Sequence, residues 1–460
     1  MKKKIISMAL MAAMGLSLLT GCGSDAGTKK DDAPADNPAD DAADDEEQPA
    51  DDAGEEKEPE GDAQSGDEVT LTWAVFETDN YTTEVWQHII DTFEADNPGI
   101  KIEKVLMTGD SRPQFLKTML AAGNMPDINV DPVDLASTDG IYAEVPEELL
   151  GKYEDTAIAT YNGKHTLVPA YKALRNQCYY HRDQFEEAGI TKEPETWDEF
   201  VEVCEKLQAA GKVPLMGAGA SDIWATSFGW WTGVANSDIV CKYPDFNEKV
   251  LSGELKWTDD VIVESLTKWQ ELINAGYYHK GSMSFSYTQA SEEFKNGSAA
   301  MFMDGAWSAA GYDNGGFTED QIGVFIVPAP TGAKSYCTMP QYWGVSETCE
   351  HKEEAFKFCE YVLGGNPDLY AYYLKADGTY SVTKDPVNYE MGPIQTKFVD
   401  NYKDVTLVPE IMKVVGDVAM PSGFEDFTCK SLQNVFTGAD VKAELETWDA
   451  EMQRLLSSAE

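Results

Sequence analysis

The chain has 460 residues and a formal net charge of −46 at pH 7, with 81 acidic side chains against 35 lysines and arginines. Nucleic-acid backbones are bound by clustered lysine and arginine, so this composition argues against a nucleic-acid partner. The same negative field repels small anions and favours a neutral or cationic ligand.

The first 21 residues have the pattern of a secretory signal peptide. Lys2, Lys3 and Lys4 precede an apolar run over residues 5–19. The run is too short to cross about 30 Å of hydrocarbon comfortably, and no later segment offers the ~18 uninterrupted apolar residues that a membrane span needs. We therefore predict a signal peptide over residues 1–21 and no transmembrane helix after it.

The signal ends in Leu19-Thr20-Gly21-Cys22, which resembles the lipobox of bacterial lipoproteins. In that family the signal is cut before the cysteine, and the cysteine is then lipid-modified. The resemblance implies a mature protein that begins at Cys22 and is anchored by lipid to the extracytoplasmic face of the cell membrane. An ordinary signal peptide and a transmembrane anchor are the alternatives.

An acidic segment follows the anchor. Residues 31–68 contain eighteen carboxylates and one lysine, without a large apolar side chain. Such a segment cannot bury enough surface to offset its conformational entropy, and self-repulsion extends it. We predict that residues 22–68 form a disordered tether that holds a folded part away from the membrane.

The folded part, residues 69–460, exceeds the usual size of one hydrophobic core and therefore predicts two lobes. Its opening alternates strand-like and helix-like periods, which predicts a mostly parallel sheet covered by helices. The expected elements are a strand at 70–76, a helix at 84–95, a strand at 100–105, a helix at 113–122 and a strand at 128–130.

The middle and the end of the chain are more helical. Thr196 and Glu199 have the spacing of a capping box, which predicts a helix beginning there. Amphipathic periodicity predicts further helices over residues 261–275 and 447–456. Trp73, Trp86, Trp197, Trp269 and Trp448 occupy the core-facing positions of these elements, so we expect them to pack in the interior.

The cysteines and histidines suggest no metal site and no cofactor. Seven cysteines follow Cys22, an odd number, and they show neither C-x-x-C spacing nor zinc-ligand spacing with the five scattered histidines. Free buried thiols are the simplest expectation, and a disulfide among them stays open. The chain also lacks a P-loop, a G-x-S-x-G elbow and a dinucleotide-binding fingerprint.

Several short motifs occur in order along the chain. They are FEADNPGIKI at 93–102, AAGNMPDI at 121–128, NGKHTLVP at 162–169, YYHRDQF at 179–185, AGI and PETWDEF within 188–200, and FKNGSAAM followed by GAW within 294–307. Together they resemble the motifs of family 1 extracellular solute-binding proteins, the maltose-binding-protein-like components of ABC sugar transporters. His181 departs from the asparagine that this family usually has at that position.

The resemblance implies a two-lobe α/β clamp of the periplasmic-binding-protein type (type II), each lobe a mostly parallel sheet flanked by helices. We expect residues 69–175 and 305–365 in the N-terminal lobe, and 176–300 and 366–460 in the C-terminal lobe. The chain would cross between lobes near 171–178, 298–306 and 363–370. A monomer would bind a carbohydrate, most simply an oligosaccharide, in the cleft and deliver it to a membrane permease.

Sugar recognition requires flat aromatic rings and polar groups that bond paired hydroxyls. Trp307 follows a predicted strand in the family's G-x-W motif and is expected to stack on the ligand. Trp224 or Trp231 in the stretch 217–233 is expected to do the same. Trp343, in a segment similar to the family's cleft strand, and Tyr171, at the first crossing, are equally consistent with the cleft and with the core.

Polar ligand contacts are expected in loops that follow strands, because ligands of open α/β sheets bind beyond the strand carboxyl ends. Arg175 is expected to pair with one of the acids in these loops. Each of them could also be a solvated side chain or a helix cap. The candidates are Glu77, Asp79, Asn80, Asp110, Asp131 and Asp304.

Two other functions stay open. A surface glycoside hydrolase would need two carboxylates about 5–5.5 Å apart in a retaining enzyme, which a sequence cannot reveal. No motif of the chain indicates catalysis, so we expect a binding protein and not an enzyme. The same clamp could instead bind a polyamine, a peptide or another small solute, and the acidic charge would suit a cation.

Overall fold

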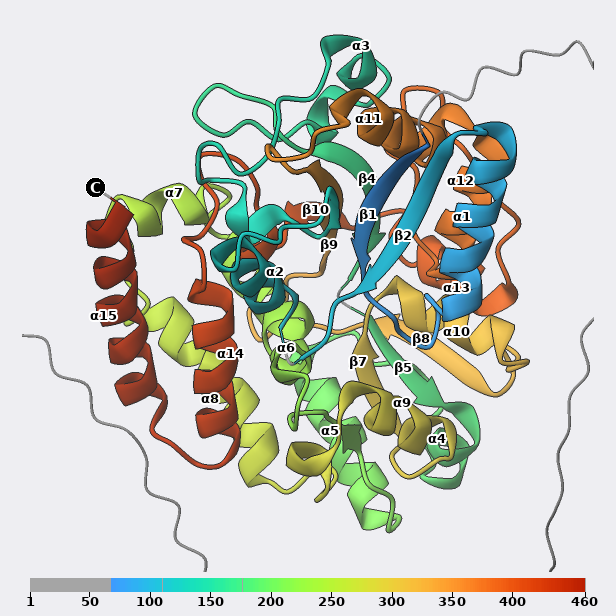
Figure 1. The fold of residues 1–460 in the computed structure, drawn as a ribbon. Helices are drawn as coiled ribbons and strands as arrows, with labels where there is room; N and C mark the ends of the chain where they lie inside the picture. Colours follow the sequence, from blue (N-terminus) through green and yellow to red (C-terminus); the bar gives the residue numbers. More distant parts are fainter. Residues whose placement is uncertain (1–67, 110, 176, 460) are drawn as a thin grey trace, which may run out of the picture. The chain divides into compact units, whose positions relative to one another are not determined.

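A computed structural model describes residues 68–109, 111–175 and 177–459 (Figure 1). The predicted signal peptide, Cys22 and nearly all of the predicted tether lie outside this range, as does Asp110. Within the described ranges, no helix has both the length and the apolar character needed to cross a membrane.

The first sheet has the strand order β10-β9-β3-β1-β2, with β4 also paired to β9. Strand β1 pairs in parallel with β2 and β3, whereas β9 runs antiparallel to β3 and β4 and parallel to β10. The strands are β1 (Val69–Val75), β2 (Ile100–Leu106), β3 (Ile128–Val130), β4 (Val168–Leu174), β9 (Ser335–Val345) and β10 (Thr406–Pro409).

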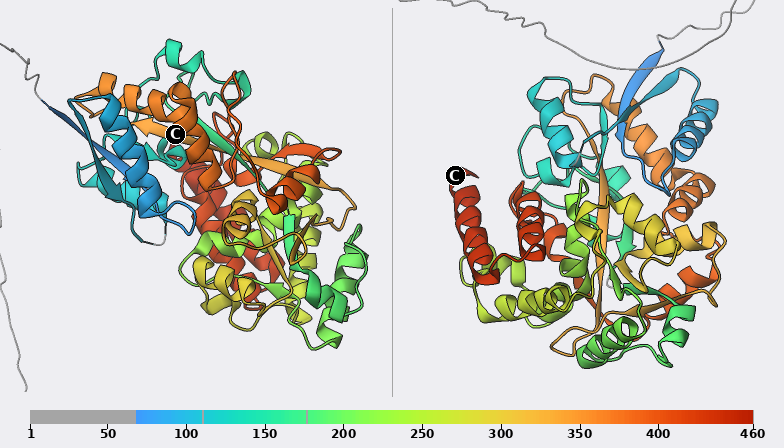
Figure 2. Two further views of the ribbon diagram at one scale, coloured as in Figure 1. Left: turned by 90° about the vertical axis from the view of Figure 1, so that its right-hand side faces the viewer. Right: turned by 90° about the horizontal axis from the view of Figure 1, so that it is seen from below.

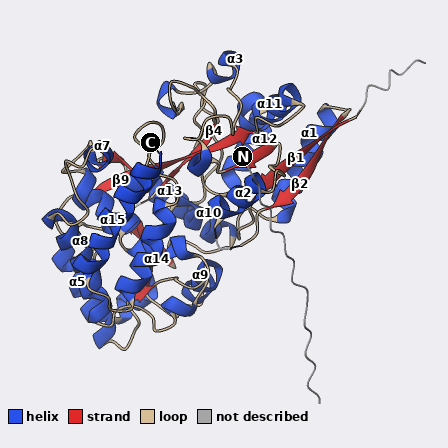
Figure 3. Cartoon of the chain, turned by 60° about the vertical axis from the view of Figure 1, so that its left-hand side comes forward, coloured by secondary structure: helices blue, strands red, loops and turns tan. Residues whose placement is uncertain are grey.

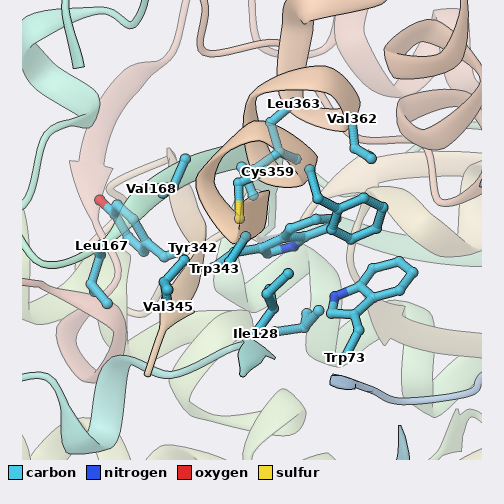
Figure 4. Close-up of a cluster of buried hydrophobic side chains, with 14 of the residues drawn as sticks. Trp73, Ile128, Leu167, Val168, Tyr342, Trp343, Val345, Cys359, Val362 and Leu363 are labelled. Carbon is cyan, nitrogen blue, oxygen red and sulfur yellow. The ribbon is translucent and has the colours of Figure 1, made fainter. Parts of the chain in front are cut away.

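Helices cover this sheet and enclose an aromatic core. Trp73 of β1 packs against Trp343 of β9, with ring centroids 4.9 Å apart, and against Phe358 of α11 at 5.0 Å; Figure 4 shows the two tryptophans side by side. Helices α12 and α1 pack together (Figure 2). The helices of this lobe are α1 (Thr83–Asp96), α2 (Arg112–Ala121), α3 (Glu147–Leu150), α11 (Lys352–Glu360) and α12 (Pro367–Ala376).

The second sheet has the order β6-β7-β5-β8. Strand β5 is antiparallel to both β7 and β8, and only the β6–β7 pair is parallel, so the expectation of a mostly parallel sheet is corrected for this lobe. The four strands are β5 (Gln177–His181), β6 (Leu215–Met216), β7 (Met301–Asp304) and β8 (Ile322–Ile326).

Most of the remaining helices belong to the second lobe, and Figure 3 distinguishes the helices from the strands of the described fold. They are α4 (Arg182–Glu187), α5 (Trp197–Ala209), α6 (Ile223–Thr226), α7 (Phe246–Leu251), α8 (Asp260–Asn274), α9 (Tyr287–Lys295), α10 (Ala306–Asn314), α13 (Pro393–Asp400), α14 (Phe424–Phe436) and α15 (Val441–Ala459). Short or wide helical turns are η1 (Val133–Leu135), η2 (Asp155–Ala157), η3 (Ser227–Gly229), η4 (Trp231–Val240), η5 (Ser282–Ser284), η6 (Tyr361–Gly365) and η7 (Ile411–Lys413).

The division of the chain between the two sheets differs from the expected boundaries. Strand β8 lies in the second sheet, although residues 305–365 were expected in the N-terminal lobe. Residues of α12 belong to the core of the first sheet, although residues 366–460 were expected in the C-terminal lobe. Strand β9 joins both, because Cys337 packs in the core of the second lobe and Trp343 in that of the first.

Local sequence signals are confirmed where they were strong. The elements expected over residues 70–130 appear within one or two residues of their predicted ends. Thr196 Oγ1 accepts a hydrogen bond from the Glu199 amide, and the Glu199 carboxylate accepts from the Thr196 amide, which is the predicted capping box. The five tryptophans expected in the interior are all less than 9% exposed.

The cysteines of the described residues behave largely as expected. Cys178, Cys204, Cys349, Cys359 and Cys429 carry free, buried thiols, and the free thiol of Cys241 is half-buried. Burial raises the pKa of the Cys204 and Cys178 thiols, because the interior destabilises a thiolate. These side chains therefore act as small hydrophobic groups in the core.

Candidate ligand-binding cleft

A cleft with a cavity volume of about 310 Å³ lies between the two sheets, and residues from both lobes line it. The first lobe contributes the loop after β1 and the start of α2. The second contributes α6, α9 and α10, and the start of α14 closes the cleft near η7. This volume falls within the size of small-molecule sites in proteins.

Four side chains form an aromatic wall on the second lobe: Trp224, Phe228, Tyr287 and Trp307. The ring centroids of Trp224 and Tyr287 are 5.0 Å apart, and those of Phe228 and Trp307 are 5.8 Å apart. All four line the cleft, and Trp224, Tyr287 and Trp307 keep part of their surface exposed. Such rings offer flat apolar faces to a ligand.

The wall is held from behind by Asp304 at the end of β7. Trp307 Nε1 donates to Tyr287 Oη at 2.7 Å, and Tyr287 Oη donates to Asp304 Oδ2 at 2.8 Å. Asp304 is 2% exposed. Burial raises the pKa of this carboxyl to about 6, against the lowering effect of its hydrogen bonds from Ser308, Gly305 and Tyr287.

The opposite wall comes from the first lobe. The Arg112 guanidinium lies over the Phe76 ring, 3.5 Å from its centroid, and Arg112 Nη1 is 3.4 Å from Asp131 Oδ2. Asp131 has a φ of 57°, a left-handed conformation that aspartate tolerates better than most residues. The loop after β3 therefore turns sharply enough to direct this carboxylate to the cleft.

The loop after β1 links both lobes. Asn80 Nδ2 donates to the Trp307 carbonyl and to Asp377 Oδ1, both at 2.9 Å. Burial raises the pKa of Asp377 to about 7, partly offset by the Asn80 hydrogen bond. Asp79 lies 3.7 Å from Lys295 Nζ.

Glu77 lies in the same loop, at the cleft rim. Its carboxylate accepts from Lys104 Nζ at 2.9 Å and from Thr83 Oγ1 at 2.6 Å. These two hydrogen bonds lower the pKa of Glu77, so the side chain stays ionised.

A buried ion pair holds Arg175, one of the residues that line the cleft. Arg175 Nη1 is 2.7 Å from Glu410 Oε1, so Arg175 pairs with an acid that was not among the expected ones. Its guanidinium lies 5.1 Å from the Trp307 ring centroid and 5.3 Å from that of Phe228. Tyr171, which is 3% exposed, also lines the cleft.

A second ion pair that lines the cleft joins Lys413 to Glu425. Lys413 Nζ and Glu425 Oε2 are 2.7 Å apart. Burial tends to lower the pKa of Lys413, but the surrounding carboxylates of Glu425, Asp131 and Glu410 outweigh it and raise the pKa. The lysine therefore stays charged in the cleft.

Most of the residues expected to bind ligand do line the cleft, and three do not. Asp304 lies behind the aromatic wall. Trp231 is 3% exposed and stacks on Trp448 in the core of the second lobe, and Trp343 is 0% exposed in the core of the first. The expected residues that line the cleft are Glu77, Asp79, Asn80, Asp131, Tyr171, Arg175, Trp224 and Trp307.

Several lining residues were missed by the sequence analysis. Tyr287 begins α9 after the capping box of Ser286 and Gln289, a local signal that locates a helix start but not a cleft. Phe228 belongs to the stretch 217–233, from which only tryptophans were selected. Asp377, Lys413 and Glu425 lie in segments that tertiary packing alone brings to the cleft.

The described residues contain no cluster of three or more His, Cys, Asp or Glu side chains able to hold a metal ion. Five of the carboxylates that line the cleft have the contacts described above: Glu77, Asp79, Asp131, Asp377 and Glu425. The residues that line the cleft offer a ligand hydrogen-bonding groups, ion pairs and aromatic rings.

Comparison with known proteins identifies relatives across most of the chain. Residues 79–364 match the family model of bacterial extracellular solute-binding proteins. A multiple sugar-binding protein of Streptococcus mutans is 26% identical over 347 residues, which cover 72% of this chain and 79% of the relative.

Solved structures share the fold. A chitin oligosaccharide binding protein aligns with a TM-score of 0.72 and 23% identity, covering 85% of this chain and all of that one. A sugar transporter protein from Bacillus licheniformis, solved with stachyose, aligns with a TM-score of 0.68 and 21% identity, covering 84% of this chain and all of that one. With the two-lobe α/β clamp and its cleft, these matches lead to one conclusion: the chain belongs to the family of bacterial extracellular solute-binding proteins.

Proposed function

We propose that this protein binds a neutral carbohydrate, an oligosaccharide, in the cleft and delivers it to the permease of an ABC transporter. The aromatic wall carries this proposal. Its partly exposed rings face a polar wall that holds Asn80, Asp131 and Arg112, and this pairing suits a pyranose, which has apolar C–H faces and hydroxyl edges. The names of the relatives, which include sugar-binding proteins, agree with this ligand class.

The negative charge of the cleft favours a second ligand class, a cation such as a polyamine. Carboxylates outnumber cations among its lining residues, and a polyamine would be attracted to such a site. The carboxylates nearest the polar wall are, however, already paired: Asp131 contacts Arg112, and Glu425 contacts Lys413. A neutral ligand avoids breaking these pairs, so we favour a sugar.

Ligand titration tests the sugar assignment. We expect intrinsic tryptophan fluorescence to respond saturably to at least one of raffinose, stachyose, maltose and a chitin oligosaccharide, with no product formed. Trp307→Ala should raise the Kd at least about tenfold, which corresponds to ~1.4 kcal/mol. Trp231→Phe, a change in the core outside the cleft, should leave the Kd unchanged.

The same titration separates the alternatives. No fluorescence response to any sugar, together with a saturable response to spermidine or a short peptide, would refute the sugar assignment. It would remain consistent with a two-lobe binding protein for another solute. Cleavage of any of the oligosaccharides would instead indicate a glycoside hydrolase.

We also propose that the protein is anchored by lipid on Cys22 at the outer face of the cell membrane, with residues 22–68 as its tether and residues 1–21 removed, and that it acts as a monomer. Metabolic labelling with a clickable fatty acid tests the anchor. We expect label in the membrane fraction for the wild type and none for Cys22→Ala. Label that survives this substitution would refute the anchor at Cys22.

A further inference from the structure

Asp304 is the one acidic residue expected at the cleft that the structure buries behind an aromatic side chain. Its carboxylate is 2% exposed and does not line the cleft. A buried carboxylate is costly unless its oxygens are hydrogen-bonded. The hydrogen-bond partners of the Asp304 carboxylate therefore indicate the role of this residue.

The Asp304 carboxylate accepts three hydrogen bonds. Oδ1 accepts from the Gly305 amide at 2.8 Å, and Oδ2 accepts from Ser308 Oγ at 2.7 Å and from Tyr287 Oη at 2.8 Å. An ionised carboxylate can accept all three because it carries acceptor sites only. A neutral amide in its place would present one acceptor oxygen and one donor nitrogen.

The contact with Tyr287 determines the contact with Trp307. A phenol hydroxyl has one proton, and here that proton points to Asp304. The Tyr287 oxygen is then left with lone pairs, and it accepts from Trp307 Nε1 at 2.7 Å. The order of donors is therefore fixed: indole to phenol, and phenol to carboxylate.

The backbone at Gly305, against which the Trp307 ring packs, is consistent with this orientation of the ring. A Cβ added at Gly305 would lie 2.4 Å from Trp307 ring atoms, so only glycine lets the ring lie so close to the chain. Tyr179 Oη donates to the Gly305 carbonyl at 2.6 Å and fixes this peptide unit. The indole is thus held at its Nε1 edge by Tyr287 and packs closely over Gly305.

We propose that Asp304 is a positioning residue of the ligand site, which acts through the Tyr287 hydroxyl to fix the plane of the Trp307 ring. The inference rests on the proposed function, since it assumes that Trp307 contacts the ligand. It assigns to Tyr287 and Asp304 a role in orienting the aromatic platform on which one face of a sugar ring would stack. Asp304 itself would make no contact with the ligand.

The groups that face Asp304 come from several elements. The facing titratable and charged groups are Tyr287 of α9, Tyr312 of α10, Tyr179 of β5, Arg175 after β4 and Asp377 after α12. Burial raises the pKa of Asp304 to about 6, so the carboxyl takes up its proton below about pH 6 while the tyrosines keep theirs. Protonation removes an acceptor site from the Asp304 carboxyl. The hydrogen bonds from Trp307 to Tyr287 and from Tyr287 to Asp304 should therefore weaken below about pH 6.

The first test uses the ligand-free protein. Emission and acrylamide quenching of Trp307 are obtained as the difference between each protein and the same protein carrying Trp307→Phe. We expect a change with a midpoint near pH 6 in the wild type, and its loss in Tyr287→Phe and Asp304→Asn. Tyr142→Phe is the matched control, because the Tyr142 hydroxyl is buried in the core of the first lobe and has no hydrogen-bond partner among the described residues.

An unchanged Trp307 signal in both Tyr287→Phe and Asp304→Asn, with the fold retained by circular dichroism, would overturn the inference. If Asp304→Asn fails to fold, Tyr287→Phe alone decides, because it removes one oxygen atom and keeps the ring. A loss of the pH transition in Tyr142→Phe as well would also overturn it, since the effect would then not depend on the hydrogen bonds that link Trp307, Tyr287 and Asp304.

The second test uses raffinose, stachyose, maltose and a chitin oligosaccharide as probes. For any that binds, Tyr287→Phe should raise the Kd about three- to tenfold at pH 7.5 and much less at pH 5, where the wild type has itself lost the contact. Equal Kd values for wild type and Tyr287→Phe at both pH values would overturn the inference. If none of the four sugars binds, the sugar assignment is refuted. The positioning role of Asp304 is then decided by the first test, which needs no ligand.

Discussion

At the scale of single residues, one buried ion pair holds Arg175, a residue that lines the cleft. Arg175 is 7% exposed and Glu410 is 3% exposed, and they meet where the segments after β4 and β10 come together. Removing two charges from water is costly, so each is tolerable only beside the other. Loss of one partner leaves an uncompensated charge in the interior.

We expect Glu410→Ala to lower the free energy of unfolding by about 3–5 kcal/mol, measured by urea denaturation, because Arg175 would be buried without its partner. Glu410→Gln keeps a hydrogen-bond acceptor and should cost less. The control is Asp400→Ala, which removes the exposed pair of Asp400 with Lys403 and should change the free energy by less than about 0.5 kcal/mol. Equal effects of Glu410→Ala and Asp400→Ala would contradict the expected cost of burial.

At the scale of elements, two helices begin in the same way but serve different parts of the molecule. Helix α5 and helix α9 both have a complete capping box, formed by Thr196 with Glu199 and by Ser286 with Gln289. The first residue of α9 is Tyr287, whose amide also donates to Asp222 Oδ2 at 2.8 Å. The cap of α9 therefore sets the position of a cleft residue, whereas α5 contributes none to the lining described above.

Ser286→Ala and Thr196→Ala should each cost about 1 kcal/mol of stability, because each removes the side chain that caps a helix. We expect only Ser286→Ala to raise the Kd for a bound sugar as well. Thermal unfolding and ligand titration of both variants check the two expectations. An equal loss of affinity in Thr196→Ala would mean that general destabilisation, and not the position of Tyr287, weakens binding.

At the scale of the whole folded part, the start of α14 connects the lobes. Asp134 of the first lobe accepts from Ser422 Oγ at 2.8 Å and from the Gly423 amide at 2.9 Å. Ser111, which caps α2, donates to Asp426 in the first turn of α14 at 2.8 Å. These contacts can exist only while the lobes stay close, so they favour a closed clamp over an open one.

Asp134→Ala should shift the population toward an open clamp, because it removes both acceptors of the Ser422 and Gly423 contacts. A lower fraction of the closed state weakens apparent binding in proportion. We expect a larger radius of gyration by small-angle scattering without ligand and a Kd raised about threefold or more. Asp139→Ala, which removes a long contact to Lys164 at the exposed surface, is the control and should change neither quantity.

Much of the fold was predictable because its signals are local. The strand and helix order of residues 69–130 follows from periodicity, and the motifs from Phe93 to Trp307 indicated the family that the comparison then confirmed. The lobe boundaries were less predictable, because β8 and α12 join their sheets through contacts between residues distant in sequence. A short buried strand is a run of apolar residues in either lobe, so its sequence does not indicate which of the two sheets it joins.

The candidate site shows the same limit. Trp224 and Trp307 line the cleft, whereas Trp231 and Trp343, chosen by the same reasoning, pack in the two cores. An aromatic residue near a strand end can point either way, and only the neighbouring elements decide which.

The sequence by itself determined the family, the α/β class, the helix caps and the strands that begin the first lobe, because propensity, periodicity and capping act over a few neighbouring residues. The tertiary structure decided which aromatic rings face the cleft, that Arg175 pairs with Glu410, and that Asp304 supports Trp307 from behind. These outcomes depend on distances between segments more than a hundred residues apart or on the direction of a side chain, and burial and hydrogen bonding fix both only once the chain has folded.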